Sequence, residues 1–288
     1  MRVLNKIMSF FRSLPNNRMK LYGLIGGICI IILIIAIYFQ FFYSPDDDKK
    51  FGLSNQVDTT TEFERLKNDF NNEFNNSVRR IGQDSINYPK IDQTKDIVYT
   101  IANLDIESQG KYDINIHLPA LNLSGDMAQQ ITKDIDNLFG AYTNKVVASE
   151  DHLIVYNLDY VAYLNNEILS LVIKATIKEG DNPQRVIIKT YNYDVIKNTK
   201  ITLGTLINKK NLDKQEVQNK VYEEINKIII ENEALANEGY SVYKRNISDS
   251  MYVLENTDTY FIDSNGYLYL VYCYGNTKYS GEVDLIIL

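Results

Sequence analysis

An uncharged run of 23 residues, Leu21–Tyr43, constrains this chain of 288 residues more than any other feature of its sequence. As a helix the run is about 34 Å long, which is enough to cross a bilayer. A cleavable signal has a shorter apolar core and then a small-x-small cleavage site, and Phe41 to Pro45 supply no such site. We therefore expect a retained transmembrane helix that lies in the lipid bilayer. A cleaved signal and a lipoprotein anchor at Cys29 are the alternatives.

The charges before this run predict its orientation. Residues 1–20 contain no acid and five basic residues, which are Arg2, Lys6, Arg12, Arg18 and Lys20. Basic residues that flank a span stay in the cytoplasm, so residues 1–20 should be a cytoplasmic tail and the rest of the chain should be extracellular. Because the whole chain has a formal charge of −7, the part after the tail carries −12. That charge argues against a nucleic-acid partner and is compatible with a cationic protein partner.

Cysteine usage indicates how the outer part must be stabilised. The chain has two cysteines, Cys29 in the uncharged run and Cys273 near the C-terminus. An intrachain disulfide is therefore not expected, and the roughly 245 residues after the run must rely on a hydrophobic core.

Residues 44–95 are expected to form a linker and an amphipathic stalk helix. A capping box at Thr59 and Glu62 would start this helix. Its apolar residues recur at steps of three or four, and they are Phe63, Leu66, Phe70, Phe74, Val78 and Ile81. We expect this stripe to pack on the outer domain, and self-association through it is the alternative.

Residues 96–199 are expected to form a first α+β subdomain. Strands are predicted over 96–108 and 111–119, and Pro119 should end the second because proline cannot continue a ladder. A helix is predicted over 125–149, and strands over 152–164, 167–179 and 185–195. The stripe expected to be buried on the helix consists of Met127, Ile131, Ile135, Leu138, Tyr142 and Val146.

Residues 200–288 are expected to form a second α+β subdomain. A short strand over 201–208 should precede a helix over 213–235, whose inward residues are Val217, Val221, Ile225 and Ile228. A hairpin with a tight turn at Asn265-Gly266 follows, and 281–288 should be the last strand. The predicted fold class is α+β, with antiparallel meander and hairpin strands packed on two helices.

A search for chemistry along the chain predicts a protein that is not an enzyme. The two histidines, His117 and His152, have no second ligand at metal-binding spacing. No nucleophile elbow, phosphate-binding loop or paired catalytic motif is present. We therefore expect no catalytic residue, no cofactor and no metal.

The tyrosines near the C-terminus are the candidate partner-binding residues, namely Tyr267, Tyr269, Tyr274 and Tyr279. Strand alternation puts Tyr267 and Tyr269 on the face opposite Leu268 and Leu270. If the leucines are buried, these two tyrosines should point outward, and tyrosine is common in binding hot spots. The alternative is a half-buried sheet that is simply rich in good strand formers.

The order of elements resembles the extracytoplasmic domain pair of the anti-sigma factor RsiV, which is also found in the peptidoglycan deacetylase PdaC. The stretches that carry the resemblance are "INIHLPAL", "TYNYD", "KITLGTLI", "YFIDSNGYLYLVY" and "YSGEVDLIIL". The resemblance covers about 180 residues in two parts, from about Lys111 to Asp194 and from Lys200 to Leu288.

This resemblance implies a single-pass membrane protein that displays a non-catalytic binding or sensing domain outside the cell. The partner it implies is a lysozyme-like muramidase or peptidoglycan. An accessory envelope protein that positions a separate cell-wall hydrolase or deacetylase is the alternative. The 20 residues before the span are few for a sigma-binding segment.

Overall fold

The computed structural model describes residues 59–75, 80–82, 88–108, 110–148, 153–274 and 281–288. Asp58–Leu288 form one compact unit. Within the described ranges no helix is long and apolar enough to cross a membrane. The expected span, Leu21–Tyr43, lies outside these ranges, as do His152 and Tyr279.

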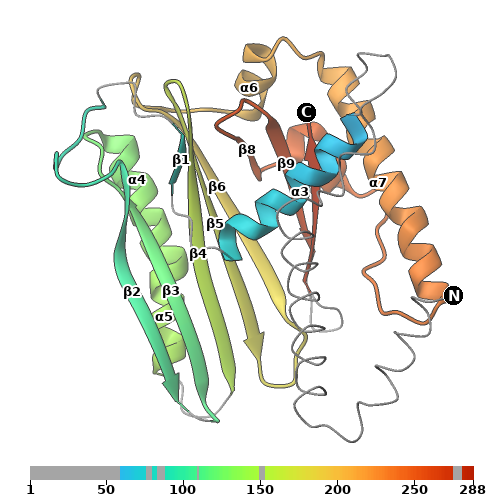
Figure 1. The fold of residues 1–288 in the computed structure, drawn as a ribbon, viewed down its shortest axis with the longest axis horizontal. Coiled ribbons are helices and arrows are strands. Elements are labelled where there is room, and N and C mark those ends of the chain that lie inside the picture. The colour runs from blue at the N-terminus through green and yellow to red at the C-terminus, as the bar shows by residue number, and fades with distance from the viewer. Residues whose placement is uncertain (1–58, 76–79, 83–87, 109, 149–152, 275–280) are drawn as a thin grey trace, which may run out of the picture. The chain divides into compact units, whose positions relative to one another are not determined.

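The first half of this unit contains a long sheet and its covering helices (Figure 1). Its elements are α3 (Thr59–Asn75), β1 (Arg80–Gly82), β2 (Val98–Ser108), β3 (Tyr112–Leu121), α4 (Asp126–Ile135), the π-helical turn η2 (Asp136–Gly140), α5 (Ala141–Val147), β4 (Ile154–Asn165), β5 (Ile168–Glu179) and β6 (Arg185–Asp194).

The second half contains two helices and a smaller sheet. Its elements are β7 (Thr199–Lys200), α6 (Leu203–Lys209), α7 (Lys214–Asn237), the short 3₁₀ turns η3 (Ser250–Tyr252) and η4 (Leu254–Asn256), β8 (Tyr260–Ile262), β9 (Leu268–Tyr274) and β10 (Glu282–Ile287). The mixed α+β class predicted from the sequence is confirmed for the described residues.

The two sheets are mostly antiparallel. The larger has seven strands in the order β2-β3-β4-β5-β6-β7, with β1 paired to β4. The pairs β3·β4 and β1·β4 are parallel, because the chain crosses over through α4 and α5 before β4. The smaller sheet is antiparallel in the order β10-β9-β8.

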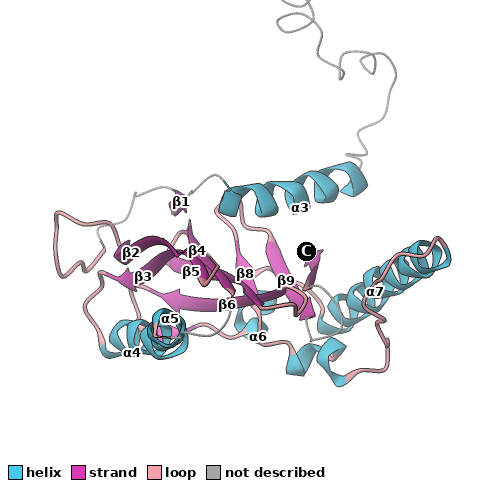
Figure 2. Ribbon diagram, turned by 90° about the horizontal axis from the view of Figure 1, so that it is seen from below, coloured by secondary structure: helices cyan, strands magenta, loops and turns pink. Residues whose placement is uncertain are grey.

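Three hydrophobic clusters hold the unit together, and the large sheet contributes to all of them. The α4 core lies between α4, η2, α5 and one face of the sheet, and the α7 core lies between α6, α7 and the small sheet. The central core joins α3, the other face of the large sheet and the small sheet. Figure 2 shows α4 and α5 on one side of the large sheet and α3 on the other. The first six residues of strand β5 are all buried, because both faces of the large sheet are covered there.

The central core joins the two predicted subdomains. Val161 and Ile188 of the first half pack there with Val271 and Leu285 of the second. The boundary between residues 199 and 200 stays a prediction.

The stalk helix is confirmed as a helix that packs its stripe on the domain. Leu66, Phe70 and Phe74 of α3 are buried in the central core. Ile81 of the predicted stripe belongs to strand β1 and not to the helix, and Val78 lies outside the described residues.

Two strand predictions were wrong. Pro119 does not end β3, which continues to Leu121. The β3·β4 ladder stops at Ile116, so Pro119 needs no N–H on that side, and a bulge in β2 adjusts the other side. The predicted strand over 201–208 is helix α6 and not a strand, because the Thr202 side chain caps a helix by accepting the backbone N–H of Thr205.

The hairpin of β8 and β9 is confirmed, but its tight turn lies one residue earlier than predicted. The Gly266 N–H donates to the Asp263 carbonyl and the Asp263 N–H donates to the Tyr267 carbonyl, so Ser264 and Asn265 are the central residues of the turn. Gly266 follows them with a φ of 91°, which favours glycine. One carboxylate oxygen of Asp263 accepts the backbone N–H groups of Asn265 and Tyr267. This Asx-type bonding stabilises the three-residue loop.

Candidate functional site

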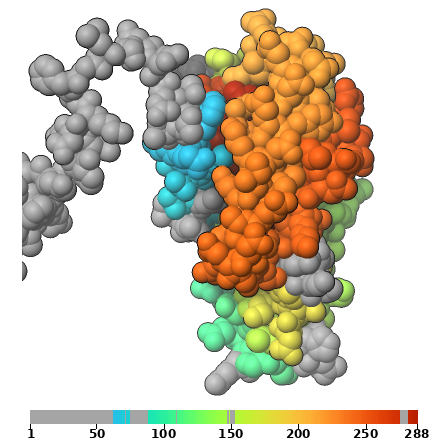
Figure 3. Space-filling model, turned by 90° about the vertical axis from the view of Figure 1, so that its right-hand side faces the viewer, coloured from blue at the N-terminus to red at the C-terminus, as the bar shows by residue number. Residues whose placement is uncertain are grey.

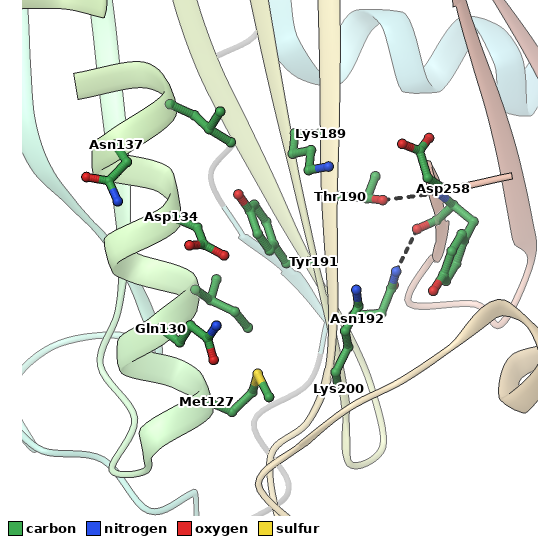
Figure 4. Close-up of a pocket in the computed structure, with 13 residues that line it drawn as sticks. Met127, Gln130, Asp134, Asn137, Lys189, Thr190, Tyr191, Asn192, Lys200 and Asp258 are labelled. Carbon is green, nitrogen blue, oxygen red and sulfur yellow. Dashed lines mark hydrogen bonds between the residues drawn. The ribbon is translucent and has the colours of Figure 1, made fainter. Parts of the chain in front are cut away.

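A groove between α4 and β6 is the strongest candidate for a functional site. Its volume is about 540 Å³. Its walls come from α4, η2, β6, β7 and the approach to β8 (Figure 4). The lining residues are Met127, Gln130, Ile131, Asp134, Asn137, Leu138, Lys189, Thr190, Tyr191, Asn192, Lys200, Asp258 and Tyr260.

Successive side chains of β6 point to opposite faces of the large sheet, so one set contacts β8 and the other faces α4. Thr190 and Asn192 point toward β8 and fix it to the large sheet. The Thr190 hydroxyl oxygen accepts the backbone N–H of Tyr260 at 3.1 Å, and the Asn192 amide donates to the Tyr260 carbonyl at 2.7 Å. Asn192 is held in turn by Ser170, whose hydroxyl donates to it at 2.7 Å. The odd-numbered residues of β6, which include Tyr191, therefore point to the opposite face of the large sheet.

Tyr191 is the residue of β6 that points into the groove toward α4 (Figure 4). Its hydroxyl oxygen is buried and has no hydrogen-bond partner among the described residues. Burial, and then the nearby Asp134 carboxylate, raise the pKa of Tyr191 to about 12, so the hydroxyl is a neutral donor at physiological pH. Most buried hydroxyls in folded proteins have a partner. A buried hydroxyl without one is a group that a ligand can satisfy.

Four charged side chains line the groove, two of each sign. They are Asp134, Lys189, Lys200 and Asp258. In the described part of the chain none of them forms an ion pair within 4 Å. Other charged residues in the same unit do form such pairs, for example Arg185 with Glu179 at 2.6 Å. Unpaired charges of both signs can bind a ligand that itself carries charged and hydrogen-bonding groups.

The π-helical turn η2 contributes Asn137 and Leu138 to the wall of the groove. A π turn contains one more residue than an α turn, so it shifts the side chains that follow. Phe139 is buried in the α4 core, while Leu138 is 53 % exposed at the groove. The prediction that Leu138 belongs to the buried stripe was therefore wrong, because that stripe assumed an uninterrupted α-helix. Such turns are frequent at functional sites.

The tyrosines predicted to be an exposed recognition surface are covered in the structure. Tyr269 is 4 % exposed and stacks on Phe261 with ring centroids 4.4 Å apart. Tyr267 is half-buried, and its hydroxyl donates to Glu62 of α3 at 2.6 Å. The outward placement was wrong because α3 packs over this face of the hairpin, while the leucine face is buried against α6 and α7.

Tyr274 is buried too, in a different environment. Its hydroxyl shares a 2.7 Å hydrogen bond with that of Tyr252, and its ring stacks on Tyr243. The guanidinium of Arg245 lies 4.6 Å from the ring centroid and is paired with Asp284 at 2.6 Å. Tyr274 is therefore part of a buried network. Tyr279, the fourth candidate, lies outside the described residues.

His117 lies on β3, on the face of the large sheet opposite the groove. Its Nδ1 atom is 3.9 Å from Asp159, the nearest carboxylate in its neighbourhood. These two residues line a polar hollow of about 370 Å³ together with Lys174 of β5. Among the described residues no cluster of three or more His, Cys, Asp or Glu side chains could hold a metal ion.

Sequence reasoning missed the groove. The stretch "TYNYD" was noticed as the end of a strand, but nothing in it showed that one of its tyrosines lacks a partner. The unpaired charges lie on segments more than 120 residues apart, from Asp134 to Asp258, so only the fold brings them together.

The solved structures that are similar to this chain include two described as DUF3298 family proteins. One is PA4972 from Pseudomonas aeruginosa PAO1, with a TM-score of 0.37 and 11 % identity over 63 % of this chain and 84 % of that chain. The other is BF2082 from Bacteroides fragilis NCTC 9343, with a TM-score of 0.33 and 12 % identity over 60 % of this chain and 79 % of that chain. No protein-family model and no curated protein sequence matches.

Proposed function

We propose that this chain is a single-pass membrane protein that displays a non-catalytic binding domain outside the cell, and that the groove between α4 and β6 is its binding site. The Tyr191 hydroxyl carries the proposal, because it is buried in the groove without a partner. The four unpaired charges around it support the same conclusion. The 23 uncharged residues after a basic tail support the anchor and its orientation.

The ligand we propose is peptidoglycan, bound through a short piece of its glycan and peptide chains. Such a piece carries carboxylates, amides and hydroxyls, which complement the two lysines, the two aspartates and the Tyr191 hydroxyl. Met127 and Ile131 offer an apolar patch beside them. A cavity of about 540 Å³ is in the size range of small-ligand sites. A muramidase would need a broad interface of roughly 800 Å² on each partner.

The resemblance of the outer region to the RsiV and PdaC domain pair supports a cell-wall ligand of this kind. The charged groups of the groove lie on both of its walls, where they can bind a ligand that carries charges of both signs.

Calorimetric titration of the full-length chain in detergent with soluble peptidoglycan fragments tests the ligand. Lys189→Gln removes a groove cation and should weaken binding at least tenfold, about 1.4 kcal/mol. The matched control is Lys178→Gln, which removes an exposed lysine of β5 that does not line the groove. Equal affinity of both variants and the parent would contradict the site, and binding of lysozyme in place of the fragments would contradict the ligand.

The topology is tested independently. A reporter fused after Leu288 should be active only outside the cytoplasm, because five basic residues hold the N-terminus inside. Activity in the cytoplasm would overturn the proposed display.

A further inference from the structure

Strand β2 is an open edge of the large sheet. It comes first in the strand order, so it pairs with β3 on one side only (Figure 1). In an antiparallel pair about half of the backbone N–H and C=O groups of each strand point away from the other strand. Among the described residues no strand pairs with the outward groups of β2. A row of unpaired backbone groups is a template for a further strand.

Other borders of the unit are covered. On the side opposite β2 the surface is helical, with α7 and α3 side by side (Figure 3). At the other end of the large sheet, β7 pairs with part of β6, and the Gly281 N–H donates to the Gln184 carbonyl just before β6. In the described part of the chain β2 has no backbone hydrogen bond of this kind on its outer side.

Strand β2 also lacks most of the features that protect natural sheet edges. It is 11 residues long and contains no proline and no lysine. Most strands have about five or six residues, and natural edges are kept short or carry prolines, lysines and bulges. The ladder between β2 and β3 is irregular only between Thr100 and Ala102, so the residues from Ala102 to Ser108 keep one register. This half of β2 is therefore a straight template.

The side chains in this half alternate between two environments. On one face they are partly buried against the α4 core, and these residues are Ala102, Leu104 and Ile106. On the other face they are exposed, and these residues are Asn103, Asp105 and Glu107. A strand that pairs with β2 would continue both rows, so it needs apolar residues on the first face and polar residues on the second.

The exposed row is acidic. Asp105 and Glu107 share one face of β2, and the exposed Asp113 of β3 lies directly opposite Glu107. In the described ranges none of these three carboxylates forms an ion pair within 4 Å, and neither does Lys111 in the connecting turn. Opposite charges on neighbouring strands stabilise a sheet and like charges destabilise it. The acids therefore favour a basic strand as the next neighbour of β2.

The same charges argue against a second copy of this chain at the edge. Two copies of β2 that pair around a two-fold axis perpendicular to the sheet present the same face on the same side. Asp105 and Glu107 of both copies would then lie close together, which is unfavourable. A basic segment gains ion pairs in the same place, and the net charge of −7 of the whole chain favours its approach.

We propose that the outer edge of β2 binds an extended, basic segment of a partner protein, which adds to the large sheet as a further strand. Its backbone hydrogen bonds provide affinity, and its lysine or arginine residues at every second position provide specificity by facing Asp105 and Glu107. This edge is separate from the groove, because β3, β4 and β5 lie between β2 and β6 in the sheet. The inference therefore does not depend on the groove or its ligand.

Fluorescence anisotropy of labelled peptides with the full-length chain in detergent tests the proposal. A peptide of alternating lysine and valine, long enough to cover the residues from Ala102 to Ser108, should bind saturably. The same peptide N-methylated along its length keeps its charges but cannot donate hydrogen bonds, so it should bind at least tenfold more weakly, about 1.4 kcal/mol. A peptide of alternating glutamate and valine should not bind.

Charge reversal locates the site. Asp105→Lys with Glu107→Lys should reverse the preference, so that the glutamate–valine peptide binds and the lysine–valine peptide does not. Both side chains are exposed, so the far-UV circular dichroism should stay unchanged. The matched control is Glu216→Lys with Glu223→Lys, which reverses two exposed acids of α7 and should leave the preference as in the parent.

Four results would each overturn the proposal. The lysine–valine peptide fails to bind, or the N-methylated peptide binds equally well, which would mean that charge alone attracts it. The control pair reverses the preference as β2 does. Asn103→Cys forms a crosslink to a second copy that the parent lacks, which would mean that β2 pairs with itself.

Discussion

At the scale of single residues, strand β6 carries two tyrosines that differ in one respect. Both Tyr191 and Tyr193 lie on the face toward α4. The Tyr193 hydroxyl donates to Asn198 at 2.6 Å, whereas the Tyr191 hydroxyl has no partner among the described residues. A structural tyrosine should have its hydroxyl satisfied, so the contrast supports the proposal that Tyr191 contacts a ligand.

The two tyrosines should respond in opposite ways to loss of the hydroxyl. Tyr193→Phe should lower the free energy of unfolding by about 0.5–1.5 kcal/mol, the net value of one hydrogen bond. Tyr191→Phe should leave it unchanged or raise it, because it removes a buried polar atom that is unsatisfied. Urea unfolding of both variants measures this. A similar loss in both would mean that Tyr191 has a structural partner.

Tyr269 was predicted to point outward, but it is buried. It stacks on Phe261, its ring also contacts that of Phe70, and it is 4 % exposed. Tyr269→Ala should therefore lower the free energy of unfolding by about 3–5 kcal/mol, as for other buried aromatic residues. Tyr267→Ala removes a half-buried side chain and should cost less. If thermal melting shows no difference between the two variants, the central core is not packed as described.

At the scale of elements, one contact between the two sheets is made by backbone atoms that lie just before β6 and β10. Gly281, just before β10, donates its N–H to the carbonyl of Gln184, just before β6. A Cβ at this position would overlap the backbone nitrogen of Val186. Gly140 in η2 is crowded as well, but there the overlapping atom is the end of the Asp136 side chain, which can rotate away.

Gly281 and Gly140 allow a direct comparison, because a new Cβ would overlap backbone atoms at the first and the end of a side chain at the second. Gly281→Ala should destabilise the protein by more than 1 kcal/mol, since two backbones must separate. Gly140→Ala should be neutral or mildly stabilising, because alanine is favoured over glycine in a helix by about 0.5–1 kcal/mol. Thermal unfolding of the two variants checks the order. If Gly140→Ala is the more destabilising of the two variants, the more crowded glycine lies in η2 and the prediction is wrong.

The elements also show what the sequence could predict. Long periodic segments such as α7 and the stripe of α3 were predicted from spacing alone, because burial on a fixed face imposes that spacing. The failures occur where a local feature competes with periodicity. The cap at Thr202 made a helix from a strand-like segment, and η2 shifted Leu138 to the surface. The faces of β9 could not be predicted, because both are buried and only the fold shows that α3 covers one of them.

At the scale of the whole unit, the large sheet separates two regions with different properties. On one face, α4 and β6 enclose a groove with unpaired charges. On the other face, α3 covers an aromatic core and places Glu73 among acids. The groove could not be read from the sequence, because its residues come from segments far apart in the chain.

The central claim is that the groove between α4 and β6 binds peptidoglycan fragments, and methyl NMR tests it most directly. Of the five methionines, Met127 lines the groove, whereas Met251 packs against the α7 core. With methyl-¹³C methionine in the full-length chain in detergent, added fragments should shift the Met127 signal, assigned with Met127→Leu, to saturation. The Met251 signal should stay in place. Saturable binding in the calorimeter with no shift at Met127 would contradict the claim.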